Sequence, residues 1–273
     1  MTTARLLTAV QPWMEQRLGV PLSALGGEPV PVVEAGGDGD GAPTLRAVKV
    51  GERGIVVASR LWADRLRPVV SNLHADLLFS VFGAFEMSRV TLPDGVGVWG
   101  PSWYLFADRE AWRPVQDTRV VHLSPLDMAR VDREMFWHCF PRETLAGFAI
   151  FERGELAALA AVRDEGEPVW EIGMDVVPAA KGRGLGRAVV SAAGDWILEK
   201  RRLVLATVAA FNVPSARTLR SVGLRYLFSE MSGVKGHFRV PPQSLGSPFP
   251  GAEVFNYYPD WAMNHNIRPR PRG

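Results

Sequence analysis

The segment Lys181-Gly-Arg-Gly-Leu-Gly186 constrains the fold of this chain strongly, because three glycines alternate there with larger residues. A strand pattern over residues 169–177 precedes it, and apolar residues at helical spacing follow it from Leu185 to Ile197. At the start of a helix, backbone N–H groups lack partners within the helix, and the helix dipole adds about half a positive charge. The pattern therefore predicts a strand, a phosphate-binding turn and a helix in succession.

Two common phosphate-binding motifs do not fit this turn. An ATP- or GTP-binding P-loop needs Lys-Ser or Lys-Thr after its last glycine, whereas Gly186 is followed by Arg-Ala. A dinucleotide fingerprint counted from Gly182 has Gly184 in place but Arg187 where the final glycine belongs. An ordinary connector is the alternative interpretation, but alternating glycines with arginines among them exceed what a connector needs.

Composition narrows the class of protein. The 273 residues are 47% hydrophobic and 22% charged, which is typical of a soluble globular protein with one large domain or two modest ones. A net charge of +2 without a basic cluster argues against a nucleic-acid partner. The single cysteine, Cys139, cannot form an internal disulfide, and no Cys/His cluster indicates a metal. With no signal-peptide pattern and no apolar run of about 20 residues, we expect a cytoplasmic protein that does not enter a membrane.

The second half of the chain alternates clearly between strands and helices. Ser124-Pro125 offers an N-cap followed by proline at the first helical position, so a helix is expected from there to Cys139. A shorter helix is expected from Asn212 to Gly223, a residue suited to a left-handed C-terminal cap. The expected strands cover residues 118–123, 148–152, 155–162, 169–177, 203–210 and 224–231. This order predicts an α+β fold with a mixed sheet.

The first half is also expected to be α+β. Helical spacing covers residues 4–18, 60–72 and 75–88, and strand patterns cover residues 30–33, 45–59 and 95–106. Asp38 and Asp40 lie in a glycine-rich stretch that lacks the remaining oxygen ligands and the closing glutamate of an EF-hand. We interpret this stretch as a solvated hairpin loop and predict no metal site.

The glycine turn also carries a family resemblance. Residues 177–188 resemble the acetyl-CoA signature of the GNAT superfamily of N-acetyltransferases, in which Arg or Gln, two residues, Gly, one residue and Gly or Ala hold the CoA pyrophosphate. Lys181 replaces the Arg or Gln here. The second family signature, an Asn about thirty residues further on that starts a helix ending in Gly and an apolar residue, matches Asn212 and Gly223-Leu224. The resemblance covers roughly residues 118–235 and implies a GNAT fold there.

The resemblance also implies how acetyl-CoA binds. The strand before the turn splays from its neighbour at a bulge, the pantetheine arm lies against the strand's free backbone, and an N–H there polarises the thioester carbonyl. Asn212 and Ser215 reach the pantetheine or the sulfur. The expected backbone contacts are Met174, Asp175 and Val176 for the pantetheine, and Gly182, Arg183, Gly184, Leu185, Gly186 and Arg187 for the pyrophosphate.

The implied reaction is direct attack of an amine on the acetyl thioester, but the family's usual acid and base are missing. Many members carry a tyrosine seven residues after the Asn, where this chain has Leu219, and a glutamate five residues before it, where this chain has Thr207. Glu171, on the strand before the turn, is therefore our candidate for the general base, and a plain surface carboxylate is its alternative.

The run Phe136-Trp-His-Cys-Phe140 invites a second chemical interpretation. Cys139 adjoins His138, but neighbours in a helix point about a hundred degrees apart, so we expect a buried thiol rather than a nucleophile. In the resembling family this region lines the acceptor side. Trp137 and His138 are therefore candidates for acceptor contact, with core packing as the alternative.

These observations divide the chain into three parts. Residues 1–115 form an N-terminal α+β domain of unknown role, either a degenerate copy of the same fold or a cap over the acceptor. Residues 116–235 form the GNAT domain, and residues 236–273 form a proline-rich tail. The expected partners are acetyl-CoA and an amine acceptor, and a homodimer is left open. The alternative function is a sensor or structural protein that binds acyl-CoA without turning it over.

Overall fold

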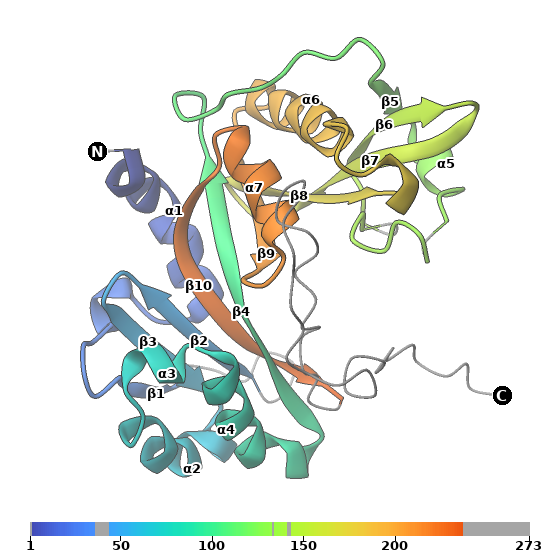
Figure 1. Cartoon of the computed structure of the whole chain (residues 1–273). Coiled ribbons are helices and arrows are strands. Elements are labelled where there is room, and N and C mark those ends of the chain that lie inside the picture. Colours follow the sequence, from blue (N-terminus) through green and yellow to red (C-terminus); the bar gives the residue numbers. More distant parts are fainter. Residues whose placement is uncertain (1, 36–43, 133, 141–142, 237–273) are drawn as a thin grey trace, which may run out of the picture.

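The computed structural model of the chain describes residues 2–35, 44–132, 134–140 and 143–236. It is built around one ten-stranded sheet (Figure 1). In sheet order the strands are β1 (Val32–Glu34), β3 (Arg53–Ala58), β2 (Leu45–Val50), β10 (Arg225–Lys235), β4 (Val96–Ala107), β9 (Leu203–Ala209), β8 (Val169–Val176), β7 (Glu155–Asp164), β6 (Ala146–Glu152) and β5 (Val121–Leu123). The α+β class with a mixed sheet is confirmed.

The four strands β5 to β8 form an antiparallel meander that continues into β9 through a helix. β8 and β9 are parallel, and the connection between them carries α6 (Leu185–Glu199). A parallel pair needs such a crossover, because the chain must return to the starting end of the sheet. Buried apolar residues of α6 pack against β7 and β8. The glycine turn connects the end of β8 to the start of this helix.

Strands from both sequence halves alternate in the middle of the sheet. β4, from the first half, pairs with both β9 and β10, and β10 in turn pairs with β2. Figure 1 shows β4 and β10 running together along the length of the molecule. The domain boundary that we predict near residue 115 falls in the connection between β4 and β5, and the division into domains stays a prediction.

Helices cover the sheet on both faces. Trp13 of α1 (Thr2–Leu18) contacts Tyr104 and Phe106 of β4, with ring centroids 6.5 and 5.8 Å apart. Successive side chains of a strand point to opposite faces, so Trp103 points to the face opposite α1. The remaining helices are α2 (Arg60–Ser71), α3 (Ala75–Leu78), α4 (Val81–Thr91), α5 (Pro125–Met128) and α7 (Val213–Ser221), and three short 3₁₀ turns lie at Leu22–Ala24, Leu92–Asp94 and Pro178–Ala180.

A buried ion pair fixes α1 to the sheet. The guanidinium of Arg17 donates to both carboxylate oxygens of Glu230 at 3.2 and 3.1 Å and to the Tyr104 hydroxyl at 2.9 Å. Glu230 is buried and also accepts from Arg46 at 2.6 Å. Because the charge of Glu230 is paired on two sides, α1 is held against β10 and β4.

One expected element is wrong. The helix expected from residue 125 to Cys139 ends at Met128, as α5. Beyond it the side chain of Asp132 accepts hydrogen bonds from the backbone N–H groups of Glu134 and Met135, at 2.9 and 3.4 Å. An aspartate that bonds to nearby backbone N–H groups competes with helix formation. The loop with Asp38 and Asp40 and the expected tail after Gly236 lie outside the described residues.

Candidate functional site

Strands β8 and β9 separate before they end. Their parallel pairing covers only Val169–Glu171 against Leu203–Leu205, although β8 continues to Val176 and β9 to Ala209. The described pairing thus stops at Glu171 and Leu205, and the two strands diverge beyond that point (Figure 1). The expected splay is present.

Hydrogen bonds at the two ends of β8 show which backbone groups face the splay. Val177 N–H donates to Ala157 O at 3.0 Å, on the β7 side, and Leu203 N–H donates to Pro168 O at 2.9 Å, on the β9 side. Since backbone groups alternate in direction along a strand, those of Met174 and Val176 point toward β9 and into the splay.

The same alternation turns the backbone of Asp175 away from the splay. Its backbone groups point toward β7, where Asp175 lies opposite Leu159. The pairing of β7 with β8 is continuous from Ala158↔Val176 to Asp164↔Trp170, so β8 diverges from β9 without the expected bulge against β7. Of the three backbone positions expected at the pantetheine, the structure brings Met174 and Val176 to the splay.

The glycine turn lies at the surface where α6 begins. Gly182 and Gly184 have φ angles of 77° and 80°, in the left-handed region that suits glycine. Both are exposed, and Gly184 is the N-cap of α6. The first hydrogen bond of the helix runs from Ala188 N–H to Gly184 O at 3.1 Å. The N–H groups of the preceding positions, 185–187, are therefore outside the helical ladder and open to an anion.

The last glycine of the turn has a packing role. A Cβ on Gly186 would lie 2.8 Å from Met174 Sδ and 3.2 Å from a methyl carbon of Val176, so the missing side chain lets α6 approach β8. Leu185 is buried in the core beside it. The turn and the splay thus touch through Gly186 and Met174.

The two arginines of the turn differ. Arg183 donates to Glu152 at 2.6 Å, in an exposed pair at the end of β6. Arg187 is exposed on the first turn of α6. Each is a cation beside the exposed glycines, and the structure brings them together with Gly182 and Gly184 as expected for the pyrophosphate side.

Asn212 caps α7. Its Oδ1 accepts from the backbone N–H of Ser215 at 3.3 Å, which is the geometry of an N-cap. At the position of the family's usual tyrosine, Leu219 is buried in the core. At the position of the usual glutamate, Thr207 donates its hydroxyl hydrogen to Glu171. Asn212 and Ser215 lie at the start of α7, directly after β9.

Glu171 is a buried carboxylate, which excludes the interpretation as a surface residue. It is 2% exposed, and one of its oxygens accepts from Arg163 at 2.9 and 2.5 Å. The other oxygen accepts from Thr207 at 2.6 Å. Arg163 also contacts Glu165, and burial, with the neighbouring charge of Glu171, raises the pKa of Glu165. Glu171 therefore belongs to a charged cluster beneath the surface, together with Arg163 and Glu165.

A histidine and an aspartate lie together on the face of β8 opposite α6. The backbone N–H of His138 donates to Asp175 Oδ2 at 2.8 Å, and His138 Nδ1 lies 2.6 Å from Asp175 Oδ1. The Trp137 ring lies beside the His138 ring, with centroids 3.5 Å apart. Sequence analysis noted His138 as an acceptor contact but missed the Asp175 carboxylate as its partner. The two residues are distant in sequence, and the irregular segment that carries His138 has no periodic pattern.

Cys139 is a buried structural thiol, as expected. It is 1% exposed, and its sulfur lies 3.4 Å from the carbonyl oxygen of Leu159. Burial, and then the nearby charge of Asp175, raises the pKa of the Cys139 thiol far above its ordinary value. A protonated and buried thiol is a poor nucleophile.

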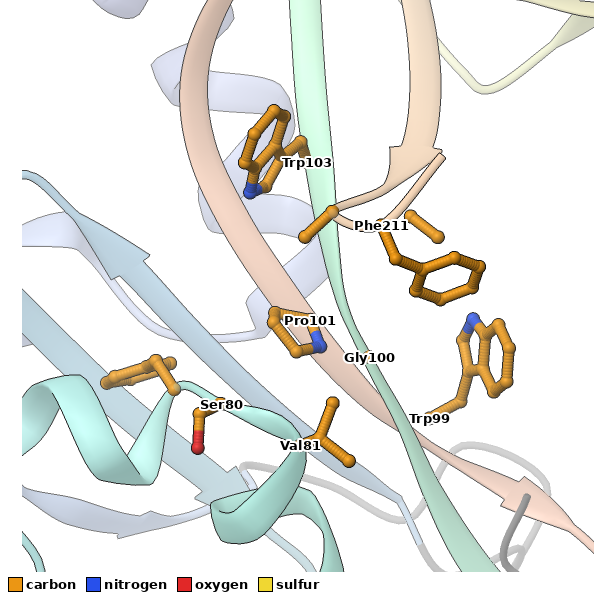
Figure 2. A pocket seen from close by; sticks show the side chains of 10 residues that line it. Ser80, Val81, Trp99, Gly100, Pro101, Trp103 and Phe211 are labelled. Atoms are coloured by element: carbon orange, nitrogen blue, oxygen red, sulfur yellow. The ribbon is translucent and has the colours of Figure 1, made fainter. Parts of the chain in front are cut away.

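An apolar pocket of about 340 Å³ lies where β9 leads into α7 (Figure 2). Its aromatic lining is Phe79, Trp99, Trp103 and Phe211. Residues from the first half, before α4 and on β4, and from the second half, after β9, share this pocket. Trp103 points to the face opposite Tyr104, and Glu171 is not among the residues that line this pocket.

Two further findings concern metal binding and membrane crossing. Among the described residues, no group of three or more His, Cys, Asp or Glu side chains is arranged to hold a metal ion. In that same part of the chain, none of the helices combines the length and the apolar character that crossing a membrane requires.

Comparison with known proteins identifies a family match for part of the chain. Residues 109–224 match the model of the acetyltransferase (GNAT) family, and no curated protein matches the chain. Solved structures that are similar include a protein assigned as a GNAT-family acetyltransferase from Novosphingobium aromaticivorans, at 20% identity over 51% of this chain and 66% of that chain, with a TM-score of 0.42. A GCN5-related N-acetyltransferase from Kribbella flavida is 15% identical over 55% of this chain and 63% of that chain, with a TM-score of 0.41.

A third similar structure is an aminoglycoside N-acetyltransferase, AAC(6')-Iy, solved in complex with CoA. It is 15% identical over 40% of this chain and 88% of that chain, with a TM-score of 0.33. The matched part spans less than two thirds of the length of the Novosphingobium and Kribbella chains. Residues 109–224, from the end of β4 to the end of α7, therefore form an acetyltransferase domain of the GNAT family.

Proposed function

We propose that this domain transfers an acetyl group from acetyl-CoA to the amine of a small-molecule acceptor by direct attack. One observation carries the proposal: the unpaired backbone of Met174 and Val176 faces a splay between β8 and β9, and the exposed glycine turn lies at the end of the same strand. A ligand with a thioester arm and a pyrophosphate matches these two features in order.

The splay would hold the reacting end of the donor. Pantetheine carries amide groups that can bond to the backbone of Met174 and Val176 as a further strand would. An N–H at either residue would then stabilise the negative charge that develops on the thioester oxygen. The contact of Gly186 with Met174 fixes this strand relative to α6.

The turn would hold the pyrophosphate. The N–H groups of residues 182–187 would bind it at the start of α6, where the helix dipole favours an anion. Arg183 and Arg187 add positive charge, and Asn212 at the start of α7 would lie along the pantetheine. Lys181 takes the place of the family's Arg or Gln and keeps a cation there.

The first half of the chain would shape the acceptor side. It supplies α1 and β4, and Tyr104 of β4 lies opposite Thr207 of β9 on the face that carries Glu171. We keep the cytoplasm as the proposed compartment, and an association into homodimers as a further proposal.

A non-catalytic function is the second candidate. It is favoured by the buried Leu219 and by Thr207, which occupy the positions of the usual tyrosine and glutamate of the family. Such a protein would bind acyl-CoA and signal or assemble without transferring the acyl group.

Two measurements test the proposal and separate the candidates. Acetyl-CoA binding is measured by calorimetry and by the shift in Tm, and free CoA thiol is then followed with a panel of primary amines that includes aminoglycosides. The acetyltransferase gives both binding and amine-dependent thiol release. A binder gives the Tm shift with no thiol release, and a protein that shows neither contradicts both candidates.

A further inference from the structure

We infer that His138, oriented by Asp175, is the general base that takes the proton from the acceptor amine. The inference rests on the proposed function and identifies a catalytic residue for it. His138 contacts Asp175 twice, through its backbone N–H at 2.8 Å and through Nδ1 at 2.6 Å. Two contacts to one carboxylate fix both the position of the residue and the direction of its ring.

The contact with Asp175 also determines which ring nitrogen is available. An ionised carboxylate only accepts hydrogen bonds, so Nδ1 of a neutral His138 carries the hydrogen and Nε2 holds a free lone pair. The side chain of His138 is 41% exposed, whereas that of Asp175 is 15% exposed. The orienting carboxylate is thus shielded while the ring remains accessible, as a base that serves an entering acceptor requires.

The pair lies over β8, at the level where the backbone of this strand borders the splay. Asp175 stands between Met174 and Val176 in β8, whose backbone groups point into the splay. A Cβ on Gly173 would lie 1.9 Å from the carbonyl oxygen of His138, so the segment that carries the histidine crosses directly over β8 at this level. Met174 and Val176 point toward α6, where they approach Gly186. Because side-chain directions alternate along a strand, positions 173 and 175 face the opposite side of β8.

Glu171 is less suited to the same task. Its side chain is 3% exposed, and both of its oxygens already accept hydrogen bonds, from Arg163 and from Thr207. The carboxylate of Glu171 is therefore shielded from an entering acceptor and engaged at both oxygens. Within the part of the chain that the structure describes, His138 has a hydrogen-bond partner at Nδ1 alone.

The proton balance of the step is simple. The ammonium form of the acceptor gives one proton to Nε2 of His138, and the freed nitrogen lone pair forms the C–N bond with the thioester carbon. The C–S bond then breaks, and its electron pair leaves with the sulfur. The sulfur takes the second nitrogen proton, directly or through water, and His138 returns its proton to solvent.

His138→Gln tests the catalytic role, and His122→Gln is the matched control. His122 lies on β5, where its ring stacks on Phe148 with centroids 5.0 Å apart, away from the splay. We expect His138→Gln to lower kcat by 10² to 10⁴-fold with unchanged CoA affinity, as the loss of a general base does. His122→Gln should leave kcat within about twofold of wild type, because this residue has no part in the proposed proton transfer.

The pH dependence gives a second measurement. Among the described residues, Asp175 is the charged group in contact with His138, and Cys139 is the further titratable group in contact with Asp175. The wild-type pH–rate profile should have an acidic limb, and this limb should be missing in His138→Gln. Long-range ¹⁵N NMR should show the hydrogen on Nδ1 in wild type and a shift toward the other tautomer in Asp175→Asn.

The outcomes separate this inference from the proposed function. Thiol release by wild type, with kcat unchanged in folded His138→Gln, overturns the role of His138 and leaves the acetyltransferase intact. A hydrogen on Nε2 in wild type overturns the orientation by Asp175. A wild type that binds CoA and releases no thiol with any amine overturns the transfer reaction and, with it, the base.

Discussion

Thr207 donates a hydrogen bond of 2.6 Å to Oε1 of Glu171 at the level where β8 and β9 stop pairing. Arg163 of β7 holds the other oxygen of Glu171 at 2.5 Å. Three neighbouring strands are thus joined by side chains immediately before the splay opens. Many members of the family carry a glutamate at the position of Thr207. Here the Thr207 hydroxyl instead binds Glu171 of the neighbouring strand β8.

We expect Glu171→Gln to affect stability more than catalysis. The substitution removes one of two close carboxylates of Arg163, which keeps Glu165 as a partner, so we expect a loss of about 1.5–3 kcal/mol in the free energy of unfolding. Urea unfolding measures this loss, and the pH–rate profile should keep its shape. Unchanged stability together with loss of the acidic limb would instead identify Glu171 as the base.

We predict that Gly173→Ala displaces the segment that carries His138. The added Cβ would lie 1.9 Å from the His138 carbonyl oxygen, far inside contact distance. The control is Gly27→Ala, because a Cβ there meets nothing within 4 Å. We expect kcat to fall by at least about tenfold in Gly173→Ala, as misplaced catalytic groups do, with CoA affinity retained. Wild-type kcat in that variant would contradict the close packing of this segment on β8.

The glycine turn and the strands around it could be predicted from the sequence because their signals are local. Alternating glycines, a capped helix and a strand that ends before Pro178 are each decided within a few residues. The turn at Gly182 and Gly184 and the cap at Asn212 accordingly lie where the pattern indicates.

The contacts across strands could not be predicted in this way. The pairing of Glu171 with Arg163 and Thr207, and of Asp175 with His138, depends on which strands become neighbours and on an irregular segment after α5. The insertion of β4 between β9 and β10 likewise joins residues about a hundred positions apart. No periodic pattern within one element specifies such neighbours.

The buried Cys139 predicts a loss of stability at alkaline pH. Burial raises the pKa of the folded thiol, whereas the unfolded thiol ionises near its ordinary value of 9.0. Above pH 9 the unfolded state therefore loses a proton that the folded state keeps, so stability falls with rising pH, by up to about 1.4 kcal/mol per pH unit.

Cys139→Ala provides the comparison for this effect. Urea unfolding between pH 8 and 11 should show a flatter alkaline decline in the variant than in wild type, since other groups titrate in both. Native Cys139 should also fail to react with a thiol reagent, so that the thiol measured in the transfer assay is that of CoA. Equal slopes in the two proteins would show that the thiol is not protected by the fold.

The last prediction concerns the turn and uses two glycines with the same backbone geometry. Gly182 and Gly51 have φ angles of 77° and 57°, and a Cβ on either meets nothing within 4 Å, so valine at each position suffers similar backbone strain. Only at Gly182 would the side chain also stand where the CoA pyrophosphate approaches the start of α6. We expect Gly182→Val to weaken CoA binding by about 10²-fold, since contacts of a charged phosphate with N–H groups are worth about 1.5–3 kcal/mol each. Gly51→Val should lower Tm by a similar amount and leave CoA affinity unchanged. Calorimetry on both folded variants makes the comparison, and equal CoA affinity in the two would place the pyrophosphate somewhere other than this turn.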